Sequence, residues 1–246
     1  LWPEAAYPIF YNEAQEVIAP LDLKGRATNT AIISGIPSWE VGKKDYRYYN
    51  SIFVVGDGKG MYHKQKLVPF GEFIPFENLI RGTMPFFDLP LSSFSRGQYN
   101  QSNLQAKGFS FAPFICYEVI YPELVRRLGK DADFLLTVSN DAWFGKSWGP
   151  DQHLEMVRMR SLELGKYMLR GTNTGITAII NHQGDTIATI PQFEEGVLRG
   201  QILQTKGSTP YSQVGYWPVL GSSAFIIFIF ALVTLRQRKI QQQDKH

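Results

Sequence analysis

The C-terminal part of the chain contains twenty consecutive uncharged residues, 216–235, with the sequence YWPVLGSSAFIIFIFALVTL. As an α-helix rising about 1.5 Å per residue, this run would be about 30 Å long, the thickness of a bilayer's hydrocarbon core. Tyr216 and Trp217 supply interfacial aromatic rings at one end, and three basic residues follow the other end (Arg236, Arg238 and Lys239). A buried core helix is the alternative, but the length, the flanks and the terminal position favour a transmembrane helix over residues 216–235.

The excess of positive charge is concentrated after this run. Residues 236–246 hold four Lys or Arg and one Asp, which leaves 21 basic and 21 acidic residues in the preceding 235. The body of the protein is therefore neutral, and nothing indicates a surface for nucleic acid. By the positive-inside rule we expect the basic tail 236–246 in the cytoplasm and the preceding domain on the extracytoplasmic side.

The chain has 246 residues, 44% of them hydrophobic, which is enough for one large domain, over residues 1–215. Apolar runs of strand length occur at 30–36, 50–55, 109–115 and 133–139, and segment 170–190 predicts two strands around a His-Gln-Gly-Asp turn. Helical patterns begin near Pro122 and Pro150, and the second continues to Tyr167 and Met168. The intervening segment 38–49 is polar and aromatic, which predicts a loop or hairpin excursion. Strands that alternate with helices predict a layered α/β domain.

The single cysteine lies where a buried strand should pass into a helix. The apolar run 109–115 ends at Cys116, and Pro122 fits the first turn of the following helix. A thiol at such a junction can be exposed at its tip while its backbone is fixed, as a nucleophile requires. The other interpretation is that Cys116 is a small buried hydrophobic residue.

Three further polar residues stand beside apolar segments. Glu4 follows what we interpret as the end of a strand, Lys64 and Lys66 alternate on a strand-like segment, and Glu72 lies in an irregular loop. A buried carboxylate needs a cationic partner, which one of the lysines could supply. The four histidines have no metal-ligand spacing, so we expect no metal. A cysteine–histidine pair through His63 or His153 stays open. The aperiodic stretch 79–100 is either a lid or membrane-dipping arm, or a loop packed on the domain.

Three separated motifs, WPE at Glu4, YHKQKL at Lys64 and ICYE at Cys116, together resemble the nitrilase (carbon–nitrogen hydrolase) superfamily. The motifs LVPFGEFIP, ICYEVIYPE, SNDAWFG and RGTNTG, followed by a terminal membrane span, look more narrowly like its bacterial apolipoprotein N-acyltransferase family. The resemblance implies a nitrilase-like α-β-β-α sandwich over residues 1–215, and that the first strand precedes Leu1. It places the protein in the bacterial inner membrane with a periplasmic catalytic domain.

The resemblance also implies the residues that act. Glu4 is the expected base, Lys64 the group that stabilises an oxyanion and Cys116 the nucleophile. Supporting roles fall to Glu72 and Glu118, and softer candidates for shaping an acyl pocket are Asn50, Tyr117, Trp143 and Phe144.

The implied reaction needs no cofactor and has two substrates. A fatty acyl group moves from a phospholipid, through a thioester on the cysteine, to the N-terminal amine of a lipoprotein. The alternatives are an amidase that hydrolyses a small C–N bond and, from another class, an inactive domain that binds lipid or lipoprotein.

Overall fold

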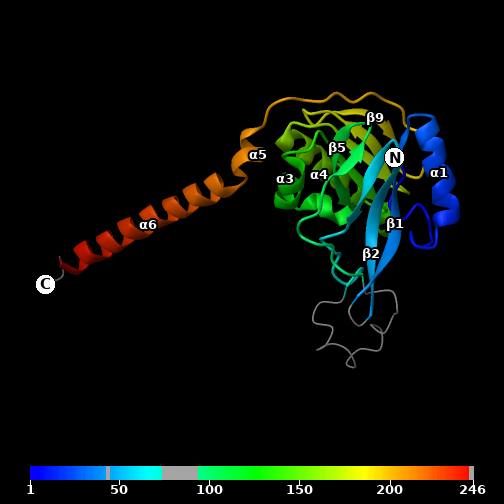
Figure 1. The fold of residues 1–246 in the computed structure, drawn as a ribbon. Coiled ribbons are helices and arrows are strands. Elements are labelled where there is room, and N and C mark those ends of the chain that lie inside the picture. The colour runs from blue at the N-terminus through cyan, green and yellow to red at the C-terminus, as the bar shows by residue number, and fades with distance from the viewer. Residues whose placement is uncertain (43–44, 74–93, 244–246) are drawn as a thin grey trace.

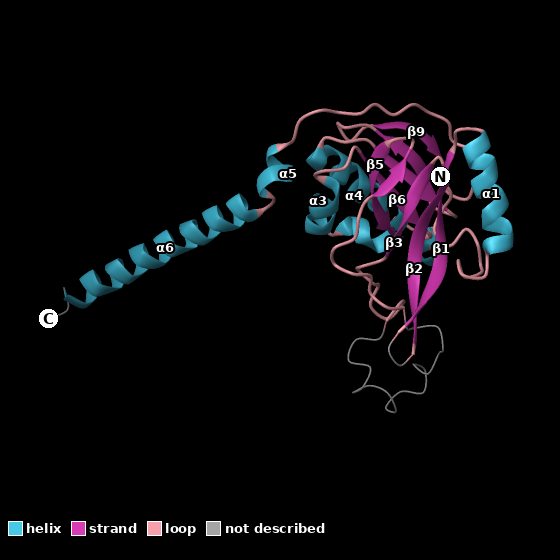
Figure 2. Cartoon of the chain, in the orientation of Figure 1, coloured by secondary structure: helices cyan, strands magenta, loops and turns pink. Residues whose placement is uncertain are grey.

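The computed structural model describes residues 1–42, 45–73 and 94–243. Its helices and strands, in chain order, are α1 (Gln15–Ala27), β1 (Ala31–Val41), β2 (Tyr46–Gly56), β3 (Gly58–His63), β4 (Leu104–Ala106), β5 (Phe109–Ile115), η2 (Cys116–Ile120), α3 (Pro122–Gly129), β6 (Phe134–Ser139), η3 (Asp141–Phe144), α4 (Gly149–Leu164), β7 (Met168–Thr172), β8 (Thr177–Ile180), β9 (Thr186–Ile190), α5 (Pro210–Val214) and α6 (Trp217–Gln243). Helices and strands alternate from β5 to β7, as the sequence predicts, whereas β1–β3 and β7–β9 follow one another directly (Figure 2).

The nine strands lie in sequence order, from β1 to β9, in one mixed sheet. Strand β6 is parallel to both β5 and β7, and the other neighbouring strands are antiparallel. Helices α3 and α4 form the crossovers between the parallel strands, because a parallel connection has to return across a face of the sheet. The carboxyl ends of β5 and β6 therefore meet at one edge, where Ile115 pairs with Val138.

The sheet folds over so that its two halves face each other. Buried side chains of β1 and β2, such as Ile33 and Ile52, share one core with Phe114 and Leu136 of β5 and β6. Helix α1 covers the outer side of β1 and β2, and α3 and α4 cover the other half (Figure 1). The layer order is thus α-β-β-α, as expected.

Several local predictions are confirmed and several are wrong. Strand 109–115 is found as predicted, and α3 begins at Pro122. For segment 38–49 the hairpin alternative is the correct one, since β1 and β2 continue through most of it as a long hairpin. Lys64 and Lys66 do not lie on a strand, because β3 ends at His63. Most of the stretch 79–100 lies outside the described residues.

Segment 170–190 contains parts of three strands, β7, β8 and β9, where two are predicted, and β7 begins at Met168, within the predicted helical pattern. The helix ends instead at Leu164, where Gly165 adopts the left-handed conformation with φ 64°. Glycine at this position is a common helix terminator, because it has no Cβ to clash.

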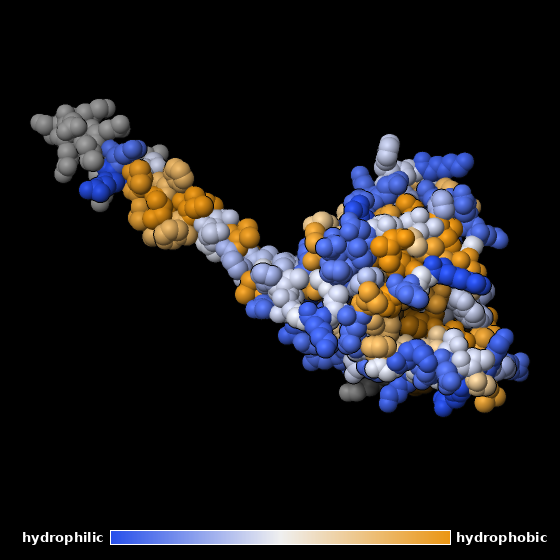
Figure 3. All heavy atoms as spheres, turned by 90° about the horizontal axis from the view of Figure 1, so that it is seen from above, coloured by the Kyte–Doolittle hydropathy of each residue, from blue (hydrophilic) through white to orange (hydrophobic). Residues whose placement is uncertain are grey.

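Helix α6 projects away from the domain (Figure 1). Its segment Trp217–Gln237 has 21 residues, and an 18-residue window within it has a mean hydropathy of 2.3 with none of its residues buried against the protein. Apolar side chains cover the middle of this helix in the space-filling view (Figure 3). Among the described residues, α6 is the one helix that is long enough and apolar enough to cross a membrane.

Candidate active site

Cys116 sits at a sharp elbow between β5 and η2. Its φ is 51°, in the left-handed region that non-glycine residues rarely adopt. Such a conformation costs about 1–3 kcal/mol and persists where the surrounding structure enforces it. The elbow lies at the carboxyl end of a parallel strand, where sites in α/β proteins are usually built. The thiol is half-buried and is the chain's one cysteine.

Glu4 is carried to the elbow by an irregular segment that runs along β1. The backbone N–H of Trp2 donates to Ile33, and that of Gly35 donates to Pro3. A Cβ on Gly35 would lie 2.7 Å from the Cα of Glu4, closer than side chains can approach. Glycine at position 35 is therefore needed for Glu4 to reach its place. Residues 1–3 do not form a strand, in contrast to the expectation that Glu4 ends one.

The carboxylate of Glu4 is buried and has partners on both oxygens. Oε1 accepts a hydrogen bond from Nδ2 of Asn50 at 2.7 Å and lies 3.8 Å from Nζ of Lys64. Oε2 accepts from the backbone N–H of Asn140 at 2.7 Å. Burial raises the pKa of Glu4, and the charge of Lys64 and the bond from Asn50 only partly oppose this.

Lys64 lies between two carboxylates with 1% of its side chain exposed. Its Nζ donates to Oε1 of Glu72 at 2.7 Å, and Glu72 also accepts from Asn50 at 3.2 Å and from the backbone N–H of Val68 at 2.8 Å. Burial alone would lower the pKa of Lys64, but the charges of Glu4 and Glu72 raise it above its usual value. The lysine is therefore a fixed ammonium group.

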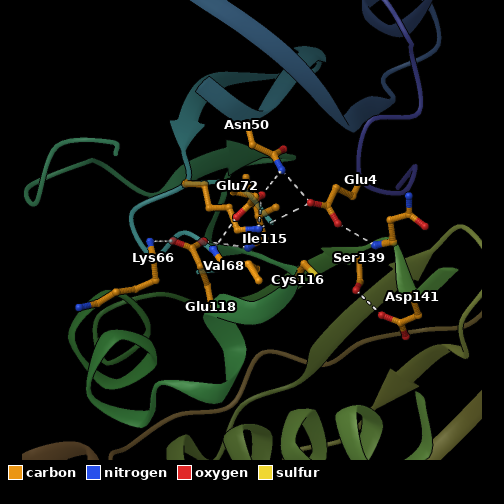
Figure 4. Close-up of polar contacts among 12 residues, drawn as sticks. Glu4, Asn50, Lys66, Val68, Glu72, Ile115, Cys116, Glu118, Ser139 and Asp141 are labelled. Carbon is orange, nitrogen blue, oxygen red and sulfur yellow. Dashed lines mark hydrogen bonds and ion pairs between the residues drawn. The ribbon is translucent and has the colours of Figure 1, made fainter. Parts of the chain in front are cut away.

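The thiol of Cys116 lies within electrostatic reach of this cluster. Burial and the charge of Glu4 raise its pKa to about 11, while the charge of Lys64 and the nearby hydroxyl of Ser139 act in the opposite direction. Figure 4 shows Glu4, Asn50 and Glu72 converging from separate segments, with Cys116 between them and the Ser139–Asp141 pair. At neutral pH the sulfur carries its proton, so reaction requires a base.

Glu118 holds the elbow in place through hydrogen bonds to the backbone around it. Its side chain is fully buried and accepts from the backbone N–H groups of Ile115 (2.9 Å), Gln65 (2.6 Å) and Lys66 (3.0 Å), and from the hydroxyl of Tyr62 (2.9 Å). Burial raises the pKa of Glu118 to about 7, even though these backbone donors lower it. The carboxyl group thereby ties the segment after Lys64 to the segment that carries the cysteine.

The four residues expected to shape an acyl pocket occupy different surroundings. Asn50 bridges Glu4 and Glu72 through its amide nitrogen, so it contacts the proposed catalytic groups. Tyr117 packs edge-to-face on Tyr121, with ring centroids 5.4 Å apart. Trp143 and Phe144 are 84% and 43% exposed on η3. Their role in an acyl pocket stays a prediction.

Sequence reasoning missed a second polar cluster behind the cysteine. Asp141, His153 and Arg170 are buried there, and Ser139 donates to Asp141 at 2.6 Å. The motifs SNDAWFG and RGTNTG contain two of them, but no spacing shows that they meet. His153 contacts the backbone oxygen of Cys116, whereas His63 bonds Ser51 at 2.8 Å and has no described bond to the cysteine.

In the part of the chain that the structure describes, no metal cluster lies at the cysteine, and one cavity lies elsewhere. Among the described residues, no three His, Cys, Asp or Glu side chains are grouped to hold a metal ion. A cavity of about 600 Å³ is lined by residues 1–3, by parts of β7 and β8 and by residues 196–200. Cys116, Lys64 and Glu4 are not among the residues that line it.

Two solved structures resemble the described fold. A carbon–nitrogen hydrolase from Helicobacter pylori G27 matches with a TM-score of 0.56 at 15% identity, over 75% of this chain and 65% of that one. A mutant amidase from Nesterenkonia sp. AN1 matches with a TM-score of 0.52 at 17% identity, over 74% and 66%. In that amidase, the acetamide moiety of fluoroacetamide is covalently added at the active-site cysteine. These similarities confirm the nitrilase-like α/β fold.

Curated relatives are much closer in sequence. Apolipoprotein N-acyltransferase of Pseudomonas aeruginosa is 45% identical over this whole chain, and that of Vibrio vulnificus is 48% identical over 97% of it. The chain spans about half of these relatives, 47% and 48% of their lengths. The model of the carbon–nitrogen hydrolase family matches residues 1–211. The chain therefore belongs to the carbon–nitrogen hydrolase family.

Proposed function

We propose that this chain is the catalytic part of an N-acyltransferase that moves a fatty acyl group from a phospholipid to the N-terminal amine of a lipoprotein. The observation that carries the proposal is the pairing of a protonated thiol on a strained elbow with the Glu4–Lys64 ion pair. The acyltransferase relatives, which are 45–48% identical, support the choice of substrates.

The first half-reaction begins with proton transfer. Glu4 takes the proton of Cys116 as the sulfur attacks the ester carbonyl carbon of the phospholipid, which forms a C–S bond and an oxyanion. The ammonium group of Lys64 stabilises that oxyanion, and a well-placed donor of this kind is worth about 3 kcal/mol. The C–O bond then breaks, the lysophospholipid oxygen recovers the proton from Glu4, and an acyl thioester stays on Cys116.

The second half-reaction consumes the thioester. The amine nitrogen of the lipoprotein attacks the thioester carbonyl while Glu4 accepts one of its protons. The C–S bond breaks, an amide forms, and the sulfur recovers the proton from Glu4. Donor and acceptor thus use the same groups in turn, and the scheme is a ping-pong reaction.

The neighbouring residues support these steps in our proposal. Glu72 holds Lys64 in place through the 2.7 Å contact, and Glu118 fixes the backbone on both sides of the site. Asn50 orients the two carboxylates that it bridges. Tyr117, Trp143 and Phe144 shape the pocket for the acyl chain.

The membrane arrangement is part of the proposal. Helix α6 spans the bacterial inner membrane, residues 236–246 face the cytoplasm, and residues 1–215 form the catalytic domain in the periplasm. Support comes from the length and hydropathy of the helix and from the basic residues that follow it. A lipid substrate would then reach the cysteine from the membrane.

Hydrolysis of a small amide is the second candidate, favoured by the likeness to the Nesterenkonia amidase and its adduct on cysteine. The thiol chemistry is the same there, with water as the acceptor. The exposed apolar helix argues against this candidate, because a small polar substrate requires no membrane anchor. A domain that only binds lipid or lipoprotein would need none of the Glu4–Lys64–Cys116 set.

Mass spectrometry after incubation with lipid separates these possibilities. The protein is purified in detergent micelles and incubated with a phospholipid of defined acyl chains, and the tryptic peptide 108–126 that contains the cysteine is analysed. We expect an adduct of fatty-acyl mass on wild type, its release as an amide when a lipoprotein peptide is added, and none on Cys116→Ala. Cys116→Ser is the matched control, since a hydroxyl is a far weaker nucleophile here. An unmodified peptide with every lipid, or an acyl group lost only to water, would contradict the proposal.

A further inference from the structure

The cluster behind Cys116 joins three buried polar residues from three elements. Asp141 begins η3 at the end of β6, His153 lies in the second turn of α4, and Arg170 lies on β7. Their exposed fractions are 0%, 5% and 1%. Burying such groups is costly unless they satisfy one another, so the cluster calls for an explanation.

The contacts form a chain that ends on the cysteine. Nη2 of Arg170 donates to Oδ2 of Asp141 at 2.6 Å, and Oδ1 of Asp141 lies 3.1 Å from Nδ1 of His153. Nε2 of His153 lies 3.3 Å from the backbone oxygen of Cys116. That oxygen can only accept, so a hydrogen bond at this contact is donated by a hydrogen on Nε2. The imidazole therefore donates to the carbonyl of the nucleophile itself.

The position of Asp141 is tightly determined. Burial alone would raise its pKa, but the bonds and charges of His153 and Arg170 hold it below the ordinary value, so it is an anion. Gly175 leaves room for it, because a Cβ there would overlap the carboxylate. The preceding residue, Asn140, donates its backbone N–H to Glu4. The same short segment thus supports both the base and the nucleophile.

The elbow needs such support on its carbonyl side. The positive φ of Cys116 is unfavourable, and Glu118 secures only the preceding N–H, that of Ile115. We propose that His153, oriented by Asp141 and Arg170, is a positioning residue that clamps the carbonyl of Cys116 and holds the sulfur at the Glu4–Lys64 pair. This inference deepens the proposed function and rests on it for the nature of the substrate.

Two substitutions at His153 separate clamping from packing. The amide nitrogen of glutamine can occupy the place of Nε2 and donate to Cys116, whereas the shorter asparagine reaches only the place of Nδ1. We therefore compare His153→Asn with His153→Gln, and use His182→Asn, at an exposed histidine in the turn after β8, as the matched control. Each variant is made in the intact protein in detergent, and its melting temperature is recorded.

The first readout is the rate and KM of acyl-enzyme formation with phospholipid. The second is the pH profile of the alkylation of Cys116 by iodoacetamide in the folded protein, measured on peptide 108–126 after digestion. A displacement of about 1 Å at a reacting atom can cost about a hundredfold in rate. We expect His153→Asn to slow acyl-enzyme formation by about ten- to a hundredfold at unchanged KM, with an altered alkylation profile. His153→Gln should recover most of the rate and the wild-type profile, and His182→Asn should match wild type.

Two results would overturn the clamp. One is a folded His153→Asn protein with the wild-type rate and alkylation profile. The other is an equal loss in both His153 variants that follows their melting temperatures, with unchanged profiles for the folded fraction. Alkylation needs no lipid, so it tests the clamp even if wild type takes no acyl group from phospholipid. That last result would instead count against the proposed function.

Discussion

Replacing Lys64 with methionine tests the electrostatic core of the site. Nζ of Lys64 lies 2.7 Å from Oε1 of Glu72 and 3.8 Å from Oε1 of Glu4, with almost no exposure to solvent. Methionine has a similar length without the charge. The substitution would leave two neighbouring buried carboxylates that share a single amide donor, Asn50.

The size of the effect follows from these distances. At an effective dielectric constant of about 20, Coulomb's law gives about 6 kcal/mol for the closer contact and about 4 kcal/mol for the other. Because the cost of burying the ammonium group is recovered, the net loss of stability should be about 3–5 kcal/mol. The pKa of Glu4 is already raised by burial, and losing the cation raises it further. The native state then binds protons more tightly than the unfolded chain, so the destabilisation grows as the pH rises.

Lys64→Met should reduce the rate of acylation more than it reduces stability. Losing the oxyanion donor costs about a hundred- to a thousandfold, and Glu4 retains its proton more often, which weakens the base. We expect the rate of acyl-enzyme formation near neutral pH to fall by at least about a thousandfold. The assay follows the acyl adduct on peptide 108–126 over time, with circular dichroism to monitor folding.

A double variant separates the effect of charge balance on stability from the effect of Lys64 on acylation. Lys64→Met with Glu72→Gln removes one surplus carboxylate, and the amide oxygen can take the place of Oε2 and still accept from the backbone N–H of Val68. It should recover much of the stability of the single variant and none of its acylation. Acylation by Lys64→Met within tenfold of wild type would refute the assigned role of the lysine. Equal stability of the single and double variants would refute the charge argument.

Two further substitutions test how the site is held. Gly35→Ala places a Cβ 2.7 Å from the Cα of Glu4, so we expect a loss of about 1–3 kcal/mol in unfolding free energy and slower acylation at unchanged KM; wild-type kinetics would contradict the close approach. Native Glu118 titrates at about 7 and an unfolded glutamate near 4.3, so stability falls as the pH rises through 7. Glu118→Gln should therefore flatten the melting temperature between about pH 5 and pH 8, and an unchanged slope in calorimetry would be incompatible with this assignment.

The local structure around the cysteine could be predicted because its signals are local. A short apolar run that ends at Cys116 and a proline at the first helical turn define the strand, the junction and the helix. The motifs at Glu4 and Lys64 could be linked to the cysteine only through the family resemblance, since nothing in their spacing requires a contact. The 3.8 Å approach of Glu4 to Lys64 depends on residues 1–6 running along β1.

The cluster behind the cysteine could not be predicted in this way. Asp141, His153 and Arg170 are separated by 12 and 17 residues, and they meet only because β6 and β7 are parallel neighbours and α4 crosses between them. The start of β7 is obscured by Tyr167 and Met168, which continue the helical period. Gly165 is the available signal, because a helix terminator there separates α4 from the strand that carries Arg170.

The charge balance of the site bears on the order of events in the proposed reaction. Two carboxylates and one ammonium group surround a half-buried thiol, so the local charge is negative, and a resting thiolate would add to it. Burial, together with the charge of Glu4, raises the pKa of the thiol to about 11, so in the proposed reaction the sulfur stays protonated until Glu4 takes its proton. The same property makes the sulfur a poor leaving group, which lengthens the life of the thioester. A long-lived acyl-enzyme would suit the proposed reaction, whose second substrate is a whole protein, because the acyl group would have to be held until that protein arrives.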